Sequence, residues 1–208
     1  EQFLESSAKE VLGHLTAANT FNADRTQVDA WIQEIDILKS VLMPYKGHVA
    51  FEYTIPRLGK RVDVLLIIDI AVLVLEFKVG AASFDRSAKE QVHDYALDLK
   101  NFHETSHDKY IAPILVATEA AKGFRVVAKT PMRDGVLKPL HCNADNLAEA
   151  IADILQFCDA PPIDAEVWNR GAYHPTPTIV EAARALYSAH SVEEITRSDA
   201  AGEQLRRT

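Results

Sequence analysis

The chain has 208 residues, of which 48% are hydrophobic and 25% charged, and its formal net charge at pH 7 is −8. This length suits one domain with a sizeable core and leaves room for a small appendage. The acidic balance argues against a protein that coats DNA through a basic surface, but it does not exclude an enzyme that binds phosphates through a metal and a few local cations.

The first elements in chain order are predicted to be helices. Residues 1–22 predict an amphipathic helix, and a second helix is predicted to begin at a cap formed by Asp24 or Thr26 and to end before Pro44. Residues 1–7 have neither the basic start nor the apolar stretch of a signal peptide.

Three β-prone segments follow. Residues 49–56 predict a strand, 58–60 a turn, and 61–69 and 71–79 two further strands. The longest apolar run, residues 62–75, contains two aspartates and is rich in Val and Ile, so it indicates sheet and not a membrane span.

The remaining predicted elements complete an α-β-β-β-α-β order. Residues 84–103 predict a helix, and 110–118 predict a strand in which Pro113 indicates an edge or a bulge. The later predictions are a short strand pair at 124–128 and 136–141 and helices at 146–158 and 178–189. We therefore expect an α/β fold in which helices flank a mixed sheet, and not a doubly wound one.

Two carboxylates occupy notable positions in the hairpin of residues 61–79. A turn near Asp69 places Asp63 directly across from Glu76, and alternation along each strand puts Lys78 on the same face. Opposed like charges on an apolar hairpin are destabilising, and a divalent cation shared by both carboxylates would remove the problem. The alternative is an Asp–Lys or Glu–Lys ion pair at a strand end, with the second acid solvated.

Asp63 followed by Glu76-Phe77-Lys78 resembles the signature of the PD-(D/E)xK nuclease superfamily, with Val62 in the place of the proline. The resemblance covers residues 26–118 and implies a restriction-endonuclease-like fold. It also implies a Mg²⁺ site, in which Mn²⁺ can substitute, formed by Asp63, Glu76 and the carbonyl of Phe77. Lys78 would orient or help to deprotonate the attacking water.

Other residues match this family less specifically. Gln91 and Tyr95, one helical turn apart, are similar to the QxxxY motif of the RecB-like branch and would position the water, Lys78 or the phosphate backbone. Glu34 matches a helical acid that many members add to the metal site; its alternative is a solvated helix face. Three cations that lead into the site are candidates for nucleic-acid binding: Arg57, Lys60 and Arg61.

The whole chain also resembles, more distantly, the N-terminal region of bacterial Schlafen-group helicases. Because the chain has no P-loop of its own, this likeness implies a helicase domain or subunit as a partner and a role in phage defence or DNA processing. We expect a nuclease-like domain at 1–160, with its core at 26–142, and a helical extension or linker at 161–208. Cys142 and Cys158 lack a CxxC spacing and are typical of reduced thiols in a cytoplasmic protein without a membrane partner.

Two further motifs are better explained by structure than by function. His103-Glu-Thr-Ser-His107 matches the zinc-peptidase HExxH pattern, but it falls where a helix is predicted to end, so we expect two solvated histidines favourable to the helix dipole. Residues 168–174 contain aromatics that could stack bases, although a cluster that caps the core is the preferred interpretation.

The function predicted from the sequence is metal-dependent hydrolysis of phosphodiester bonds in nucleic acid, with DNA preferred over RNA. Two alternatives remain open: a non-cleaving nucleic-acid-binding module with the nuclease fold, and a protein-interaction domain in a helicase assembly.

Overall fold

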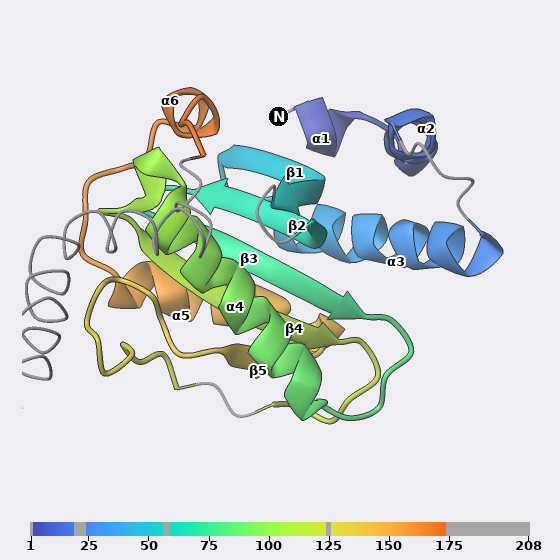
Figure 1. The fold of residues 1–208 in the computed structure, drawn as a ribbon. Coiled ribbons are helices and arrows are strands. Elements are labelled where there is room, and N and C mark those ends of the chain that lie inside the picture. The colour runs from blue at the N-terminus through green and yellow to red at the C-terminus, as the bar shows by residue number, and fades with distance from the viewer. Residues whose placement is uncertain (1, 19–23, 56–58, 124–125, 174–208) are drawn as a thin grey trace, which may run out of the picture. The chain divides into compact units, whose positions relative to one another are not determined.

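The protein is described by a computed structural model that covers residues 2–18, 24–55, 59–123 and 126–173. Helices flank a five-stranded sheet of order β1-β2-β3-β4-β5, antiparallel from β1 to β3 and parallel from β3 to β5 (Figure 1). The strands are β1 (Gly47–Ile55), β2 (Lys60–Ile68), β3 (Ala71–Lys78), β4 (Tyr110–Ala117) and β5 (Leu140–Cys142). The predicted mixed α/β fold is thereby confirmed.

The helices match the predicted order at most positions. They are α1 (Gln2–Glu5), α2 (Ala8–Ala18), α3 (Arg25–Val41), α4 (Arg86–Phe102), α5 (Leu147–Phe157) and α6 (Ala165–Asn169), with single 3₁₀ turns η1 (Glu104–Ser106) and η2 (Ala144–Asn146). None of the helices in the described ranges is both long and apolar enough to cross a membrane. The helix predicted at 178–189 lies outside those ranges.

The hairpin of β2 and β3 turns where the sequence predicted it. Asp69 adopts a φ of 49°, a left-handed conformation that Asp tolerates better than most residues. The pairing runs from Ile68 opposite Ala71 to Val64 opposite Leu75, and continuing that register by one residue places Asp63 opposite Glu76.

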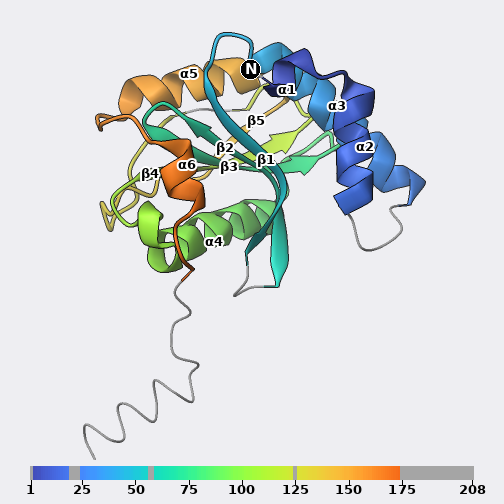
Figure 2. The ribbon, with the colours of Figure 1, turned by 90° about the horizontal axis from the view of Figure 1, so that it is seen from above.

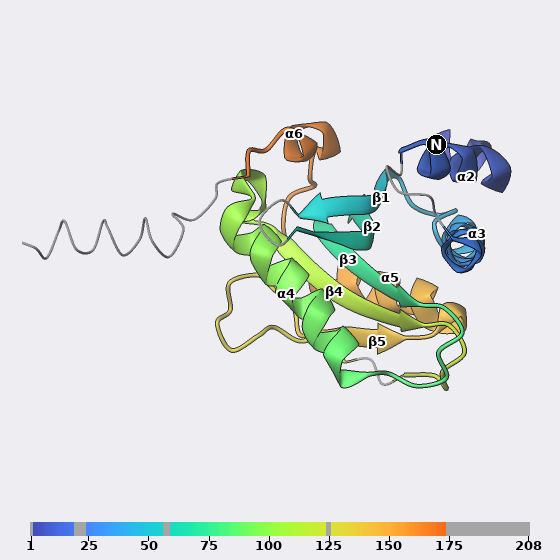
Figure 3. The same ribbon diagram turned by 45° about the vertical axis from the view of Figure 1, so that its right-hand side comes forward.

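Both faces of the sheet are covered, so alternating residues of the hairpin enter two separate cores. One core, beneath α4, contains Leu65 and Ile67 of β2 with Val72 and Val74 of β3. The other contains the intervening residues of both strands together with residues of α3 and α5. Figures 2 and 3 show α4 on one side of the sheet and α5 on the other.

The N-terminal segment differs from the single predicted helix. Ser7 interrupts it, because its backbone N–H donates to the Glu10 carboxylate at 2.7 Å while its hydroxyl accepts from the Glu10 N–H at 3.2 Å. This reciprocal capping box starts α2 afresh after α1 has ended. At α3 the cap is Asp24 and not Thr26, since the Asp24 carboxylate accepts from Gln27 N–H at 2.8 Å.

Pro113 lies in an interior strand, so the predicted edge position is wrong and the alternative, a bulge, is the better description. Ile111 bridges Val136 and Ile114 pairs with Leu140, which leaves one more residue between the bridges on the β5 side than in β4. A proline fits this break because it lacks an N–H for the ladder. Of the strand pair predicted at 124–128 and 136–141, the described residues form β5 and two isolated bridges, one between Ile111 and Val136 and one between Lys129 and Leu137. Residues 124 and 125 lie outside the described ranges.

The folded unit extends beyond the boundary predicted at residue 160 and ends at Tyr173. Ile163 donates its N–H to the carbonyl of Asp69 at 2.7 Å, and Trp168 is only 1% exposed. The Trp168 ring lies 6.0 Å from that of Tyr53, in the core beneath α4. The aromatics of this segment therefore belong to the core, as the preferred interpretation of the sequence held.

Candidate active site

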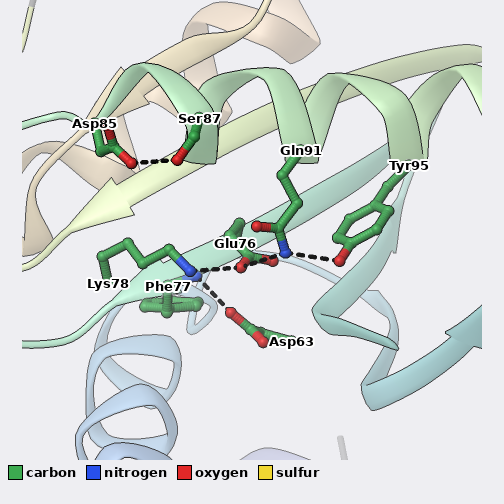
Figure 4. A network of polar contacts seen from close by, with 8 residues as sticks. All are labelled: Asp63, Glu76, Phe77, Lys78, Asp85, Ser87, Gln91 and Tyr95. Atoms are coloured by element: carbon green, nitrogen blue, oxygen red, sulfur yellow. Dashed lines mark hydrogen bonds and ion pairs between the residues drawn. The ribbon is translucent and has the colours of Figure 1, made fainter. Parts of the chain in front are cut away.

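Three of the predicted site residues meet where β2 and β3 run side by side. The Asp63 carboxylate accepts a hydrogen bond of 2.7 Å from the backbone N–H of Phe77, and Lys78 Nζ donates to Glu76 Oε1 at 2.8 Å (Figure 4). The chain turns immediately after Lys78 at Gly80, whose φ of 74° favours glycine. The structure thus brings Asp63, Glu76 and Lys78 together.

Helix α4 supplies two more side chains to the same place. Gln91 Nε2 donates to Glu76 Oε1 at 3.0 Å, and it lies 2.7 Å from the hydroxyl of Tyr95, one helical turn away (Figure 4). Tyr95 is buried and Gln91 is half-buried. Gln91 therefore contacts Glu76 directly, and Tyr95 acts on it through Gln91.

One oxygen of Glu76 is left without a partner. Lys78 and Gln91 both contact Oε1, whereas Oε2 is buried and has no hydrogen-bond donor within the described residues. Buried carboxylate oxygens are normally hydrogen-bonded or bound to a metal. The orphaned Oε2, with the Asp63 carboxylate on the adjacent strand, fits a site for a hard divalent cation.

A backbone oxygen is available at the same position. In a strand, the N–H and C=O of one residue point to the same side. Because the Phe77 N–H faces Asp63, its carbonyl faces the same edge of β3. Two carboxylates and this carbonyl are oxygen donors of the kind that Mg²⁺ and Mn²⁺ prefer.

Glu34 of α3 lies inside the protein and not on a solvated helix face. It is 5% exposed, and burial, followed by the charges of Asp63, Glu52 and Glu76, raises its pKa to about 8. Burial and the charge of Glu76 likewise raise the pKa of Asp63 to about 7. The negative charges of these side chains repel one another, and a bound cation would relieve that repulsion.

Lys78 is the cation closest to these acids. Burial alone would lower the pKa of its ammonium, but the hydrogen bond and charge of Glu76, with the charge of Asp63, raise it above the usual value. Burial raises the pKa of Glu76, while Lys78 opposes that shift. In the metal-free protein Lys78 therefore carries its charge at neutral pH.

The structure adds two residues that the sequence interpretation missed. Glu52 of β1 accepts a hydrogen bond of 2.8 Å from Trp31 Nε1 of α3, and its charge acts on Glu34, Asp63 and Glu76. The observed β1–β2 register, with Phe51 opposite Val64 and Tyr53 opposite Val62, makes Glu52 the residue opposite Asp63. The turn predicted at residues 58–60 would have placed a later residue of β1 there. The local sequence around Trp31 carries no signal for this contact, because its partner lies 21 residues away.

The three cations predicted to bind phosphate differ in their surroundings. Arg61 pairs with Glu52, its Nε lying 3.2 Å from Oε2. Lys60 is exposed at the start of β2, and its charge acts on Glu76. Arg57 lies outside the described residues.

The HExxH residues do not form a metal site, and the prediction that both histidines are solvated is wrong for His103. Helix α4 ends at Phe102, so the motif lies outside it and its middle residues form the 3₁₀ turn η1, and His103 is 1% exposed. Its ring lies 4.2 Å from that of Trp168, and its Nδ1 is 2.8 Å from Ser106 Oγ. The packing of residues 165–173 buries it, and no local pattern reports such a long-range contact.

Within the described ranges, no three His, Cys, Asp or Glu side chains are arranged to hold a metal ion as they stand. A cation bound here would therefore use the Asp63 and Glu76 carboxylates with backbone or water oxygens, unless Glu34 moved. No family model, curated protein or solved structure matches the chain.

Proposed function

We propose that this protein is a Mg²⁺-dependent nuclease that hydrolyses phosphodiester bonds of nucleic acid at the Asp63–Glu76–Lys78 site. The observation that carries the proposal is the buried Glu76 carboxylate, whose Oε1 contacts Lys78 and Gln91 while Oε2 has no partner. An ion pair at a strand end does not account for that oxygen, nor for the half-buried Asp63 carboxylate beside it.

The residues have distinct roles in this proposal. Asp63, Glu76 and the Phe77 carbonyl would hold the cation, and Glu34 would be a further or water-mediated ligand. When bound, Mg²⁺ or Mn²⁺ would lower the pKa of water and neutralise charge on the phosphate. The Lys78 ammonium, fixed by Glu76, orients the attacking water and stabilises charge that develops on the phosphate oxygens.

Helix α4 orients the site from above the sheet. Gln91 holds Glu76 in one rotamer, and the Tyr95 hydroxyl holds Gln91. Such contacts to a ligand typically matter 10-fold to 100-fold in metal affinity or activity. Lys60 and Arg61, with Arg57, would bind backbone phosphates on either side of the scissile one.

The wider role rests on the sequence likenesses alone. DNA is proposed as the preferred substrate, a helicase domain or subunit as the partner, and phage defence or DNA processing in the cytoplasm as the setting.

The test is a cleavage assay on labelled single-stranded and double-stranded DNA and RNA, with Mg²⁺, with Mn²⁺ and with EDTA. We expect cleavage that needs a divalent cation and is lost in Glu76→Gln, which preserves the shape of the side chain. The matched control is Glu90→Gln, because Glu90 lies on α4 in an exposed pair with Arg86 at 2.8 Å and takes no part in the site. Cleavage that persists in EDTA or in Glu76→Gln would disprove the proposed chemistry.

One observation favours a non-cleaving module with the same fold, namely that no three acidic, His or Cys side chains in the described ranges are arranged around one point. The same experiment separates the two functions. Such a module would retard labelled nucleic acid in a gel and leave it intact with either metal.

A further inference from the structure

Glu52 holds an unusual backbone conformation beside the acids of the site. Its φ is 51°, in the left-handed region that residues with a β-carbon rarely adopt. The pairing of β1 with β2 is interrupted there, between Phe51 opposite Val64 and Tyr53 opposite Val62. Such a conformation persists only where the surroundings hold it, and it is often found at functional sites.

Both carboxylate oxygens of Glu52 are engaged. Oε1 accepts the indole N–H of Trp31 at 2.8 Å, and Oε2 lies 3.2 Å from Arg61 Nε. Trp31 is 2% exposed and precedes Glu34 by one turn of α3, so the indole is a fixed donor. Glu52 is thus clamped to the helix that carries Glu34 and offers its second oxygen to Arg61.

Arg61 is close enough to compromise the metal site. It precedes Asp63 by two residues on β2, a separation of roughly 6.6 Å along a strand that a long Arg side chain can span. Arg and carboxylate form strong bidentate pairs. An Arg61–Asp63 pair would occupy the oxygens that a metal needs.

We propose that Glu52 is a positioning residue which, clamped by Trp31, holds Arg61 away from Asp63. This leaves Asp63 free for the cation and keeps the guanidinium, whose side chain is 42% exposed, at the margin of the site for a phosphate of the substrate strand. The inference rests on the proposed function in so far as Asp63 binds a metal. Glu52 itself is not a metal ligand, because both its oxygens are used.

The first test measures Mn²⁺ binding by calorimetry to the full chain, to Glu52→Gln, to Arg61→Gln and to the double variant. In Glu52→Gln the amide can still accept from Trp31 but no longer attracts Arg61. We expect its Mn²⁺ affinity to fall roughly 10-fold or more, as for other residues that orient metal ligands. The double variant should return to within about 3-fold of Arg61→Gln, a non-additive result.

Other outcomes have distinct meanings. If the double variant stays as weak as Glu52→Gln, Glu52 acts as a ligand and the inference is wrong. If Arg61→Gln changes the Mn²⁺ affinity by the same factor in the wild type and in Glu52→Gln, the two residues act only through the net charge of the site, and the positioning role is again excluded. Trp31→Phe, which keeps an aromatic ring, although a smaller one, and removes the N–H, should reproduce the Glu52→Gln defect and its rescue by Arg61→Gln.

A second measurement needs no metal, so it separates this inference from the proposed function. In ¹H–¹⁵N spectra of the metal-free wild type, the Arg61 Nε–H should show a hydrogen bond to Glu52. In Glu52→Gln it should instead show a hydrogen bond to Asp63, and adding Asp63→Asn should abolish that second hydrogen bond. An Arg61 that becomes solvated in Glu52→Gln would overturn the positioning role. Wild-type protein that binds no Mn²⁺ while its Arg61 behaves as expected would instead disprove the proposed function.

Discussion

The carboxylate of Asp63 takes the place of a strand partner for Phe77. The β2–β3 pairing ends with Val64 opposite Leu75, and the next β3 donor facing β2, the Phe77 N–H, bonds to Asp63 at 2.7 Å. Asp63 is therefore both a link between the strands and an acid of the candidate site.

This double role gives opposite expectations for two substitutions. Asp63→Asn removes the negative charge and should abolish Mn²⁺ binding. Because it keeps an oxygen that can accept from the Phe77 N–H, the metal-free variant should be as stable as the wild type at pH 8, or more stable. Asp63→Leu leaves the N–H unpaired and should cost about 1–3 kcal/mol of unfolding free energy. Urea unfolding in EDTA measures both, and equal losses in the two variants would contradict the link.

Lys78 and Glu76 should be strongly coupled in stability. Lys78→Met removes the ammonium that lies 2.8 Å from the buried Glu76 carboxylate, so the metal-free protein should lose about 1–3 kcal/mol at pH 8. Adding Glu76→Gln removes the stranded charge and should restore most of that loss, a coupling of roughly 0.5–3 kcal/mol. Additive losses in a double-mutant cycle would show that the pair is not held as described.

The metal-free protein should lose stability as the pH rises. The pKa of Glu34 is raised to about 8 and that of Asp63 to about 7, so the unfolded chain releases these protons at a lower pH than the folded protein does. Their stabilising contribution is complete below about pH 4 and is lost as the pH rises through 7 and 8. For each group the loss is about 1.4 kcal/mol for every tenfold difference in proton affinity between the folded and the unfolded chain.

Melting temperatures from pH 5 to pH 9 in EDTA measure this effect. Glu34→Gln should reduce the fall in melting temperature with rising pH. Mg²⁺ should reverse that fall, because it binds the ionised acids. A protein equally stable at pH 5 and pH 9 without metal would show that these carboxyls are not buried together.

His103 should matter for folding and not for chemistry. His103→Ala empties a buried position against Trp168 and Ser106, so we expect a loss of roughly 2–4 kcal/mol, in the range for large buried side chains. Cleavage by the fraction that remains folded should be within a few-fold of wild type, and zinc content should not change. His107→Ala, which removes an exposed ring 2.8 Å from the Lys100 carbonyl, should cost less.

His103 should also make the folded protein less stable at acidic pH. Burial lowers the pKa of His103 below 6.5, so the unfolded chain takes up a proton that the folded protein does not. The folded state therefore loses stability as the pH falls below 6.5, and His103→Asn should remove that part of the loss. An unchanged acid slope would contradict this assignment.

The position of Trp168 predicts where the domain can be truncated. A chain ending at Tyr173 should unfold cooperatively and keep the site, because it retains the buried indole and the Ile163–Asp69 hydrogen bond. A chain ending at residue 160 exposes Tyr53 and His103 and should be destabilised by at least the roughly 3–5 kcal/mol of a Trp→Ala change. Thermal unfolding of the two chains decides, and equal stability would place the domain boundary at residue 160.

Local patterns determined much of this protein from the sequence alone. The turn at Asp69 and the alternation of apolar residues determined the β2–β3 register, and that register brought Asp63, Glu76 and Lys78 to one place. Helical spacing put Gln91 and Tyr95 on one face of α4. These features follow from periods of two and of three to four residues, which depend only on neighbouring positions.

Contacts between distant segments decided the rest. Trp31 reaches Glu52, His103 is buried by Trp168, and Glu34 lies among acids of three strands; in each case the partners are far apart in the chain. Pro113 was tolerated inside the sheet because a neighbouring segment carries one extra residue there. The burial and charge of a side chain depend on which elements pack over it, and that packing is a property of the whole fold that no local period encodes.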